Sequence, residues 1–275
     1  MVTIAPYGTW VSPISPEDAA AAGGSPQWVD FHAGDLWWAQ TRPAEAGRVA
    51  LLRAGKDVLG PPWNVRNRVH EYGGRPYTMI GNHHLVFTHW DDQRLYRLDL
   101  DGDDAVPVPI SPEPERPAGF RYAEPIAGPA LPDDHSADVW CVRETITGDA
   151  RTDVRRDLVA VPLDGSAADD PARVRTLAAS HHFLTGPKPS PDGRHVAWIG
   201  WDHPAMPWDG TELCVAEVDD HGVLGEHRVL AGGPDEAVIQ VEWEGPSWLL
   251  ALTDPDGCGT CTASDSTARP STWQL

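Results

Sequence analysis

The feature that most constrains the fold is a unit of about fifty residues that recurs along the chain. Five apolar or aromatic runs have the length and composition of buried strands, and their first residues lie 49, 54, 57 and 52 positions apart. These runs span residues 36–39, 85–88, 139–142, 196–199 and 248–252. A fixed period of this length is typical of repeat proteins, so we expect similar structural units arranged in series.

Each unit holds more than one strand. A second strand-like run follows the first four runs, at residues 49–53, 95–100, 158–163 and 213–218, and a third follows at 106–110, 174–177 and 228–230. A short apolar segment precedes each hairpin, as at 27–31 and 238–243. Four short strands per unit is the pattern of a propeller blade. The sequence therefore predicts an all-β fold, a partial β-propeller of about four and a half four-stranded blades that ends near Leu252.

Turn residues support this register. Ser190-Pro191-Asp192-Gly193 comes just before the run at 196–199, where a tight turn would link the first two strands of a blade. A helical bundle is excluded because the chain has 27 prolines and 26 glycines, the two residues that cost most inside a helix. A β-sandwich or barrel also has many short strands, but does not repeat so regularly.

Charge and composition narrow the range of partners and compartments. Asp and Glu number 41 against 21 for Lys and Arg, and a net charge of −20 repels nucleic acid and anionic membranes. The N-terminus lacks a basic segment followed by an apolar run of signal-peptide length, so we expect a cytoplasmic protein. Four cysteines are too few and too scattered for a disulfide framework, and Cys141 and Cys214 are expected to be small buried hydrophobes.

Several motifs resemble one family. Residues 64–74 read NVRNRVHEYGG and resemble a segment in the propeller of prolyl-oligopeptidase-family serine peptidases, in the bacterial acylaminoacyl-peptidase and dipeptidyl-aminopeptidase-like branch. Further matches are KPSPDGRHVAW at 188–198, WDHPAMPWDGTEL at 201–213 and LTDPDG at 252–257. Many propellers share the SPDG turn, whereas VHEYGG combined with HPxMPW is more specific. The resemblance covers residues 1–257.

The resemblance implies a function for a longer protein. In that family a propeller, usually of about seven blades, caps a C-terminal α/β-hydrolase domain with a Ser-Asp-His triad, admits short peptides and supplies part of the substrate pocket. We expect this sequence to stop before the hydrolase domain begins. No serine lies in the Gly-x-Ser-x-Gly elbow, since GPSWL at 245–249 lacks the second glycine. We therefore expect a substrate-gating propeller fragment, inactive by itself, with no catalytic residue to assign; its partners would be short peptides and the hydrolase domain.

Six residues are candidates for contact with substrate or with the hydrolase domain. His70 beside Glu71 suggests acid–base chemistry, but both can equally form structural hydrogen bonds in a loop where Gly73 and Gly74 supply positive φ. The aromatic loop at 201–208 either covers a blade edge or reaches the peptide entry side. The candidates are His70, Glu71, Tyr72, Arg75, Trp201 and Trp208.

The sequence predicts neither a metal ion nor a cofactor. Histidines cluster at His83, His84 and His89 and again at His181 and His182, but adjacent histidines on a strand point to opposite faces. A lone Cys-x-x-Cys at 258–261, with no second pair, indicates neither a redox site nor a zinc site.

Residues 258–275 are predicted to be a frameshifted, unstructured tail, because the composition changes abruptly at Gly257 and no strand pattern follows Leu252. Residues 258–268 can be translated back into DNA with codons chosen among the synonymous ones. If one G is then inserted after the first two bases of codon 258, the shifted reading frame encodes WWNLYRVGLDG. Its last eight residues match LYRLDLDG at 95–102 in six of eight positions.

Two alternative functions remain open. A free-standing propeller that binds partners would need closed blades, whereas four and a half blades leave two open sheet edges. A propeller glycosidase would need a pair of carboxylates, and none can be placed among 41 acidic residues from sequence.

Overall fold

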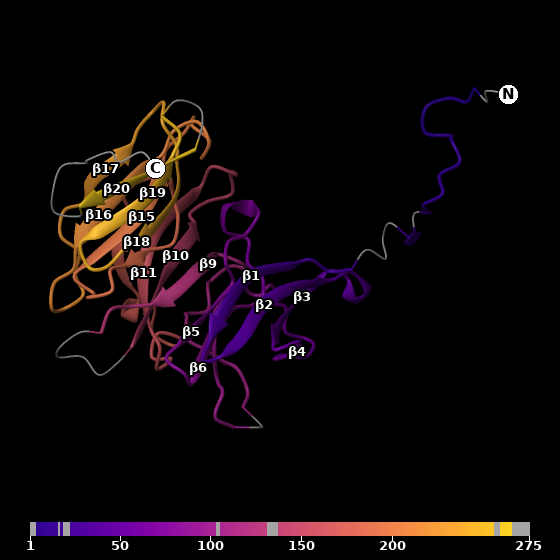
Figure 1. Cartoon of the computed structure of the whole chain (residues 1–275). Coiled ribbons are helices and arrows are strands. Elements are labelled where there is room, and N and C mark those ends of the chain that lie inside the picture. The colour runs from indigo at the N-terminus through magenta and orange to yellow at the C-terminus, as the bar shows by residue number, and fades with distance from the viewer. Residues whose placement is uncertain are drawn as a thin grey trace. The chain divides into compact units, whose positions relative to one another are not determined.

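The chain divides into two compact units, Met1–Val65 and Arg66–Leu275. The structure, a computed structural model, describes residues 4–15, 17–18, 23–102, 105–130, 137–255 and 259–265. Figure 1 labels many of the strands in both units. No helix in these ranges has both the length and the apolar character needed to cross a bilayer.

The first unit contains one antiparallel sheet of four strands in the order β1-β2-β3-β4. The strands are β1 (Pro26–His32), β2 (Asp35–Arg42), β3 (Arg48–Arg53) and β4 (Lys56–Asp57), with a 3₁₀ turn, η1 (Pro43–Glu45), between β2 and β3. β3 is buried from Arg48 through Leu52, whereas Trp28, Val29 and Phe31 on β1 are exposed.

The second unit contains four antiparallel sheets in chain order. The first two are β5 (Tyr77–Ile80), β6 (His84–Thr88), β7 (Leu95–Asp99) and β8 (Val108–Pro109), and β9 (Phe120–Ala127), β10 (Asp138–Ile146), β11 (Val154–Pro162) and β12 (Arg175–Ala178). The third has β13 (Phe183–Leu184), β14 (Lys188–Pro189), β15 (His195–Trp201), β16 (Glu212–Glu217) and β17 (Arg228–Gly232), and the fourth has β18 (Val238–Trp243), β19 (Trp248–Thr253) and β20 (Thr260–Asp265). Two 3₁₀ turns, η2 (Val69–Glu71) and η3 (Pro171–Arg173), complete the described elements.

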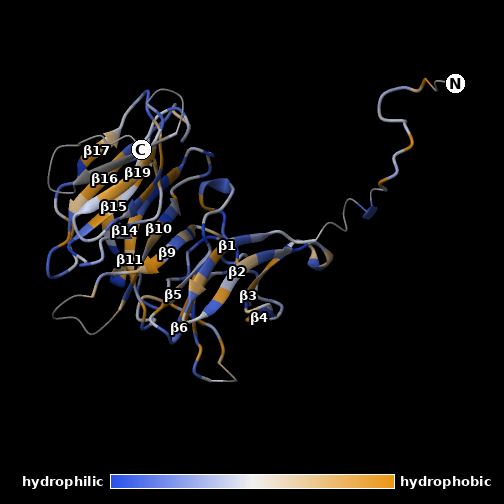
Figure 2. Ribbon diagram, viewed as in Figure 1, coloured by the Kyte–Doolittle hydropathy of each residue, from blue (hydrophilic) through white to orange (hydrophobic). Residues whose placement is uncertain are grey.

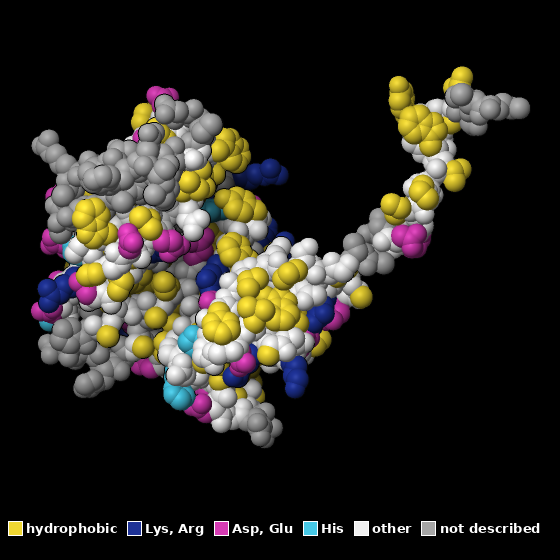
Figure 3. Space-filling view, viewed as in Figure 1, with side chains coloured by type: hydrophobic (Ala, Val, Ile, Leu, Met, Phe, Trp, Pro, Cys, Tyr) yellow, Lys and Arg dark blue, Asp and Glu magenta, His cyan; other side chains and the backbone are white. Residues whose placement is uncertain are grey.

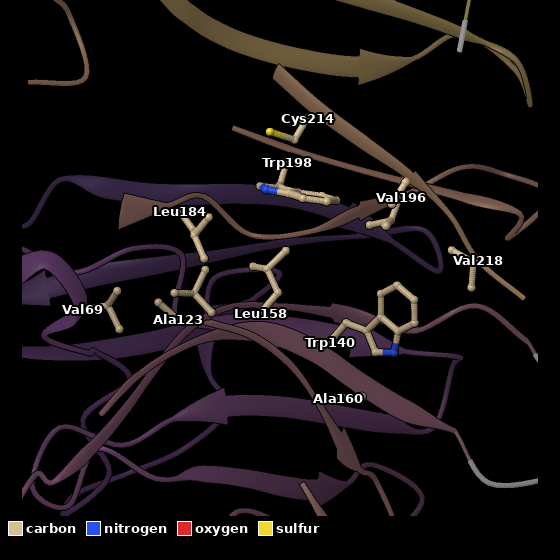
Figure 4. Close-up of a cluster of buried hydrophobic side chains, with 12 residues drawn as sticks. Val69, Ala123, Trp140, Leu158, Ala160, Leu184, Val196, Trp198, Cys214 and Val218 are labelled. Carbon is tan, nitrogen blue, oxygen red and sulfur yellow. The ribbon is translucent and has the colours of Figure 1, made fainter. Parts of the chain in front are cut away.

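Both faces of the middle sheets are buried, which explains why their strands read as continuous apolar runs. Along β10, Trp140 and Val142 belong to one core cluster, while Val139 and Cys141 belong to another. Figure 4 shows the first cluster, where Trp140 and Leu158 face Trp198 and Cys214. Figure 2 shows that hydrophobic residues are concentrated on the strands, with hydrophilic residues in many connecting loops.

The repeated hairpins predicted from the sequence are confirmed. The five apolar runs fall on β2, β6, β10, β15 and β19, and each of the first four pairs with the strand predicted to follow it. The Ser190 turn links β14 to β15: Ser190 Oγ donates to Asp192 Oδ1 over 2.7 Å, and the Gly193 amide donates to the Ser190 carbonyl over 2.9 Å. The all-β, partial-propeller prediction is thus confirmed.

Part of the segment predicted to be an unstructured tail forms a strand. Residues 260–265 form β20, which pairs with β19 from Thr253↔Thr260 to Trp248↔Asp265. Backbone hydrogen bonding to a free strand edge does not require an alternating apolar pattern, so this strand leaves little trace in the sequence. Residues 266–275 lie outside the described ranges.

Candidate functional site

The segment from Val69 to Tyr72 forms a tight turn with unusual backbone geometry. His70 and Glu71 have φ values of 57° and 67° in the left-handed region, which non-glycine residues rarely adopt. Gly73 also has positive φ, and a Cβ there would lie 2.7 Å from the Asn67 carbonyl oxygen. Gly74 does not have positive φ, contrary to expectation, but it packs closely against Glu124. Surrounding contacts must therefore hold this turn in place.

A buried carboxylate from β10 holds the turn. Glu144 is only 1% exposed, and its Oε1 accepts the His70 amide over 2.9 Å. In the sheet Glu144 lies directly opposite Arg121 of β9 and Arg156 of β11. Arg156 Nε donates to Oε1 over 2.7 Å, and Arg121 Nη1 to Oε2 over 3.3 Å. Two cross-strand arginines thus compensate the buried charge, as burial of a carboxylate requires.

Glu71 extends this network to the surface of the turn. Arg121 Nη1 donates to Glu71 Oε1 over 2.6 Å, and Arg68 Nη2 donates to Oε2 over 3.1 Å. The hydrogen bond from Arg121 lowers the pKa of Glu71, with the charges of Arg121 and Arg68 adding to the effect against desolvation. Glu71 therefore stays ionised and links the turn to the sheet.

The His70 ring lies in an aromatic cluster. Its centroid is 5.8 Å from Tyr72, 5.6 Å from Phe183 and 5.5 Å from Trp201. Phe183 and Trp201 stack at 5.2 Å, and the Arg156 guanidinium lies 4.4 Å from the Phe183 ring. Arg156 therefore joins the charged network to the aromatic cluster.

His70 is uncharged at neutral pH. Burial, together with the nearby Arg156 charge, lowers its pKa to about 3. Its Nε2 atom is buried and has no hydrogen-bond partner among the described residues. A histidine with so low a pKa is a weak base, so the acid–base interpretation loses its support. The ring acts as a neutral aromatic surface.

The structure brings four of the six predicted residues together. His70, Tyr72 and Trp201 share the aromatic cluster, and Glu71 anchors the same turn. Trp208 is 67% exposed on the loop between β15 and β16, and has no ring contact within the described ranges. Arg75 lies before β5, where its Nε donates to the Tyr77 carbonyl over 3.0 Å.

A second buried carboxylate, that of Glu124, belongs to a residue hydrogen-bonded to Arg75. The Glu124 amide donates to the Arg75 carbonyl over 2.8 Å, and Glu124 Oε2 accepts the Gly186 amide over 2.5 Å. A Cβ on Gly186 would lie 2.5 Å from the Glu124 Cβ, so glycine is needed for this approach. Desolvation raises the pKa of Glu124, opposed by Gly186, Lys188 and Arg75.

Sequence reasoning missed several residues of this site: Arg121, Glu124, Glu144, Arg156 and Phe183. A signal was present for Glu144 and Arg156, which lie in polar stretches, residues 143–145 and 155–157, that adjoin the apolar runs of β10 and β11. The register of β10 and β11 places Glu144 opposite Arg156, and this register becomes visible only in the structure.

A pocket of about 560 Å³ opens beside Trp201. Most of its lining comes from the end of β15 and the loop between β15 and β16, and residues 233–234, just after β17, also contribute. Its lining includes His181, Trp201, His203, Thr211, Glu212 and Pro234.

Comparison with known proteins places the chain among peptidase propellers. It matches a puromycin hydrolase, solved as a mutant in complex with PGG, at 45% identity and a TM-score of 0.87 over the whole chain. A puromycin-hydrolyzing peptidase of Mycobacterium tuberculosis matches at 38% identity and a TM-score of 0.85 over 98% of the chain. Prolyl oligopeptidase B of Galerina marginata, at 12% identity and a TM-score of 0.56 over 93% of the chain and 37% of its own, supports the fold alone.

No family model and no curated protein matches the chain. The chain spans 42% of the length of the puromycin hydrolase and of the mycobacterial peptidase. The chain thus shares 38–45% identity and the same fold with these peptidases along essentially its whole length. The chain therefore belongs to the β-propeller part of the prolyl-oligopeptidase family of serine peptidases.

Proposed function

We propose that this chain is the substrate-gating propeller of a serine peptidase that acts on short peptides, and that it has no peptidase activity alone. The observation that carries the proposal is the match to two puromycin-hydrolysing enzymes over essentially the whole chain. Activity would require a C-terminal α/β-hydrolase domain, which would supply the Ser-Asp-His triad.

The aromatic cluster is the proposed contact surface for peptide or for the hydrolase domain. The turn at Val69–Glu71 is fixed by the buried Glu144, so the His70 and Tyr72 rings are held in one orientation. Tyr72 is 69% exposed and Trp208 is 67% exposed, which leaves both rings free to meet a ligand. Rigid aromatic side chains bind at low entropic cost, as a gate that selects among peptides needs.

A chimera tests the gating role. Residues 1–257 would replace the segment of the puromycin hydrolase propeller that they match at 45% identity, and kcat/KM would be measured for a short peptide and for a long unfolded polypeptide. The chimera should cleave the short peptide and exclude the long one. Equal cleavage of both would show that the propeller does not gate.

Substitutions in the chimera test the contact surface. Trp201→Ala and Trp208→Ala should each lower kcat/KM for the short peptide by roughly 10-fold, equivalent to about 1.4 kcal/mol. Trp10→Ala is the matched control, because Trp10 is a tryptophan with a similar exposed fraction, 63%, that lies in the first unit. Equal effects of all three would place the substrate contacts elsewhere.

A labelling experiment tests the proposed inactivity. The isolated chain should not react with a fluorophosphonate probe, since no serine has a nucleophile elbow. Labelling of any serine in the pure chain would overturn this part of the proposal. DNA sequence downstream of codon 257 separates the peptidase from a free-standing binding propeller, because only the peptidase has a hydrolase frame there.

A further inference from the structure

A second cluster of reactive side chains lies apart from the His70 turn, at one wall of the 560 Å³ pocket. His181, Glu212 and Cys214 each offer one potential ligand atom, and these atoms lie within 4.8 Å of one another. His181 Nε2 is 3.2 Å from Glu212 Oε2. His181 and Glu212 line the pocket, whereas Cys214 is buried behind them.

Strand geometry explains why the three residues converge. Glu212 and Cys214 are two positions apart on β16, so their side chains project from the same face. Gly200 of β15 lies directly opposite Glu212. A Cβ at Gly200 would be only 2.3 Å from His181 Nδ1, so the histidine ring rests where a larger residue would have its side chain.

The His181 ring is also oriented by a hydrogen bond. Its Nδ1 lies 2.8 Å from Ser180 Oγ, which in turn accepts the Trp198 indole N–H over 3.1 Å. This contact leaves Nε2 directed toward Glu212. Histidines that bind metals commonly use one ring nitrogen for the ion and the other for such an orienting partner.

We propose that His181, Glu212 and Cys214 bind one divalent cation of the zinc class. An imidazole, a carboxylate and a thiolate form a donor set that suits zinc better than the harder magnesium or calcium ions. Zinc–nitrogen and zinc–oxygen bonds of about 2.0–2.1 Å place two tetrahedral ligands about 3.3 Å apart. The observed separation of 3.2 Å between Nε2 and Oε2 meets this requirement without rearrangement.

Three protein ligands leave a fourth coordination position. Since His181 and Glu212 both line the pocket, that position faces a space wide enough for water or for a donor atom of a ligand. Burial and the Glu212 charge raise the pKa of the Cys214 thiol to about 12, so the thiol is protonated without metal. On binding, the sulfur–metal bond replaces the sulfur–hydrogen bond and the proton passes to solvent.

Cobalt spectroscopy tests the proposal in the full chain. Because Cys258 and Cys261 could chelate a metal by themselves, the experiment uses the Cys258→Ser, Cys261→Ser background. Addition of Co²⁺ should produce a thiolate-to-cobalt charge-transfer band with one equivalent bound, and Zn²⁺ should displace it. No such band in this background would overturn the proposal.

Variants then assign the ligands. Cys214→Ala should abolish the charge-transfer band, whereas Cys141→Ala, which removes the other described buried thiol, should retain it. Glu212→Gln, which keeps the size of the side chain, should weaken Zn²⁺ binding by more than about 10-fold, and Ser180→Ala by about 10-fold through loss of ring orientation. Circular dichroism checks that each variant is folded.

Two further results would contradict the assignment. A band that survives Cys214→Ala would place the thiolate ligand elsewhere. Unchanged zinc affinity in folded Glu212→Gln would show that the His181–Glu212 contact is an ordinary hydrogen bond without a metal role.

Discussion

At the scale of single residues, Glu144 holds the turn at Val69–Glu71 in a conformation that its sequence alone disfavours. His70 and Glu71 both adopt positive φ, which costs of order 1–3 kcal/mol for each non-glycine residue. The carboxylate offsets this cost by accepting the His70 amide while two arginines neutralise its charge. The Glu144 side chain thus holds the strained backbone of the turn, pairs with the two arginines and fixes the orientation of the His70 ring.

Glu144→Gln should therefore destabilise the protein strongly. The amide keeps an acceptor for His70 but leaves Arg121 and Arg156 without a buried counter-charge, and breaking a buried ion pair costs about 3–5 kcal/mol. Urea denaturation at pH 7 measures the loss. Asp149→Asn, at an exposed ion pair with Arg116, is the control and should change the free energy of unfolding by less than about 1 kcal/mol. Similar losses in both variants would contradict the role of Glu144.

His70 should make stability depend on pH. Its folded-state pKa of about 3 lies below the usual 6.5, so below pH 6.5 the unfolded chain binds a proton here that the folded chain does not. The free energy of unfolding therefore falls as the pH drops from about 6.5 toward 3. Between about pH 7 and 5, wild type should lose about 2 kcal/mol more than His70→Gln. Parallel pH profiles from urea denaturation would contradict this assignment.

At the scale of elements, the sequence predicted the strands well and their partners across blades poorly. Trp140 and Val142 face one core while Val139 and Cys141 face another, and this burial on both sides produced the apolar runs that revealed the repeat. The site escaped prediction because it depends on register: Glu144 meets Arg121 and Arg156 only when β9, β10 and β11 are aligned. His70 and Trp201, 131 positions apart, could be proposed individually but not as neighbours.

β20 gives the frameshift hypothesis a structural test. The strand spans Thr260–Asp265, and the restored string WWNLYRVGLDG would place its LYRVG segment on residues 261–265. The corresponding strand of an earlier blade, β7, reads LYRLD. The repeat thus requires a strand at these positions, and the restored sequence is more apolar there than the present one. It has Leu at position 261, which pairs with Leu252.

Replacement of residues 258–268 by WWNLYRVGLDG should stabilise the protein. Each large apolar side chain buried contributes about 1.5–3 kcal/mol, so the free energy of unfolding should rise by at least about 2 kcal/mol. A scrambled string of the same composition is the control. Equal stability of the two replacements, or a genomic sequence in which no single-base change at codon 258 opens a frame into a Gly-x-Ser-x-Gly domain, would show that the tail is not a frameshift product.

At the scale of the whole molecule, each unit carries apolar surface that is not covered by the described residues. In the first unit, Trp28, Val29 and Phe31 of β1 and Leu36 of β2 are 44–71% exposed. Figure 3 shows hydrophobic side chains gathered on one face over β1 and β2. In the second unit, Ile239 and Trp248 of the last sheet are 56% and 42% exposed. Exposed apolar side chains that gather on one face, as over β1 and β2, mark surfaces that meet another domain or another chain.

We expect the isolated chain to self-associate through these surfaces. Burying apolar area contributes about 25 cal/mol per Å². Among the described residues β20 is also the last strand of its sheet, so its outer edge offers backbone groups to a second copy. Light scattering coupled to size-exclusion chromatography should show a mean mass that rises with concentration above the 29.9 kDa of a monomer. Phe31→Lys and Trp248→Lys should lower that mass, whereas Val106→Lys, at a loop residue also 71% exposed but outside both patches, should not. If the protein is a monodisperse monomer at all concentrations, the exposed apolar residues do not drive self-association. That result would favour a propeller that acts independently of a hydrolase domain.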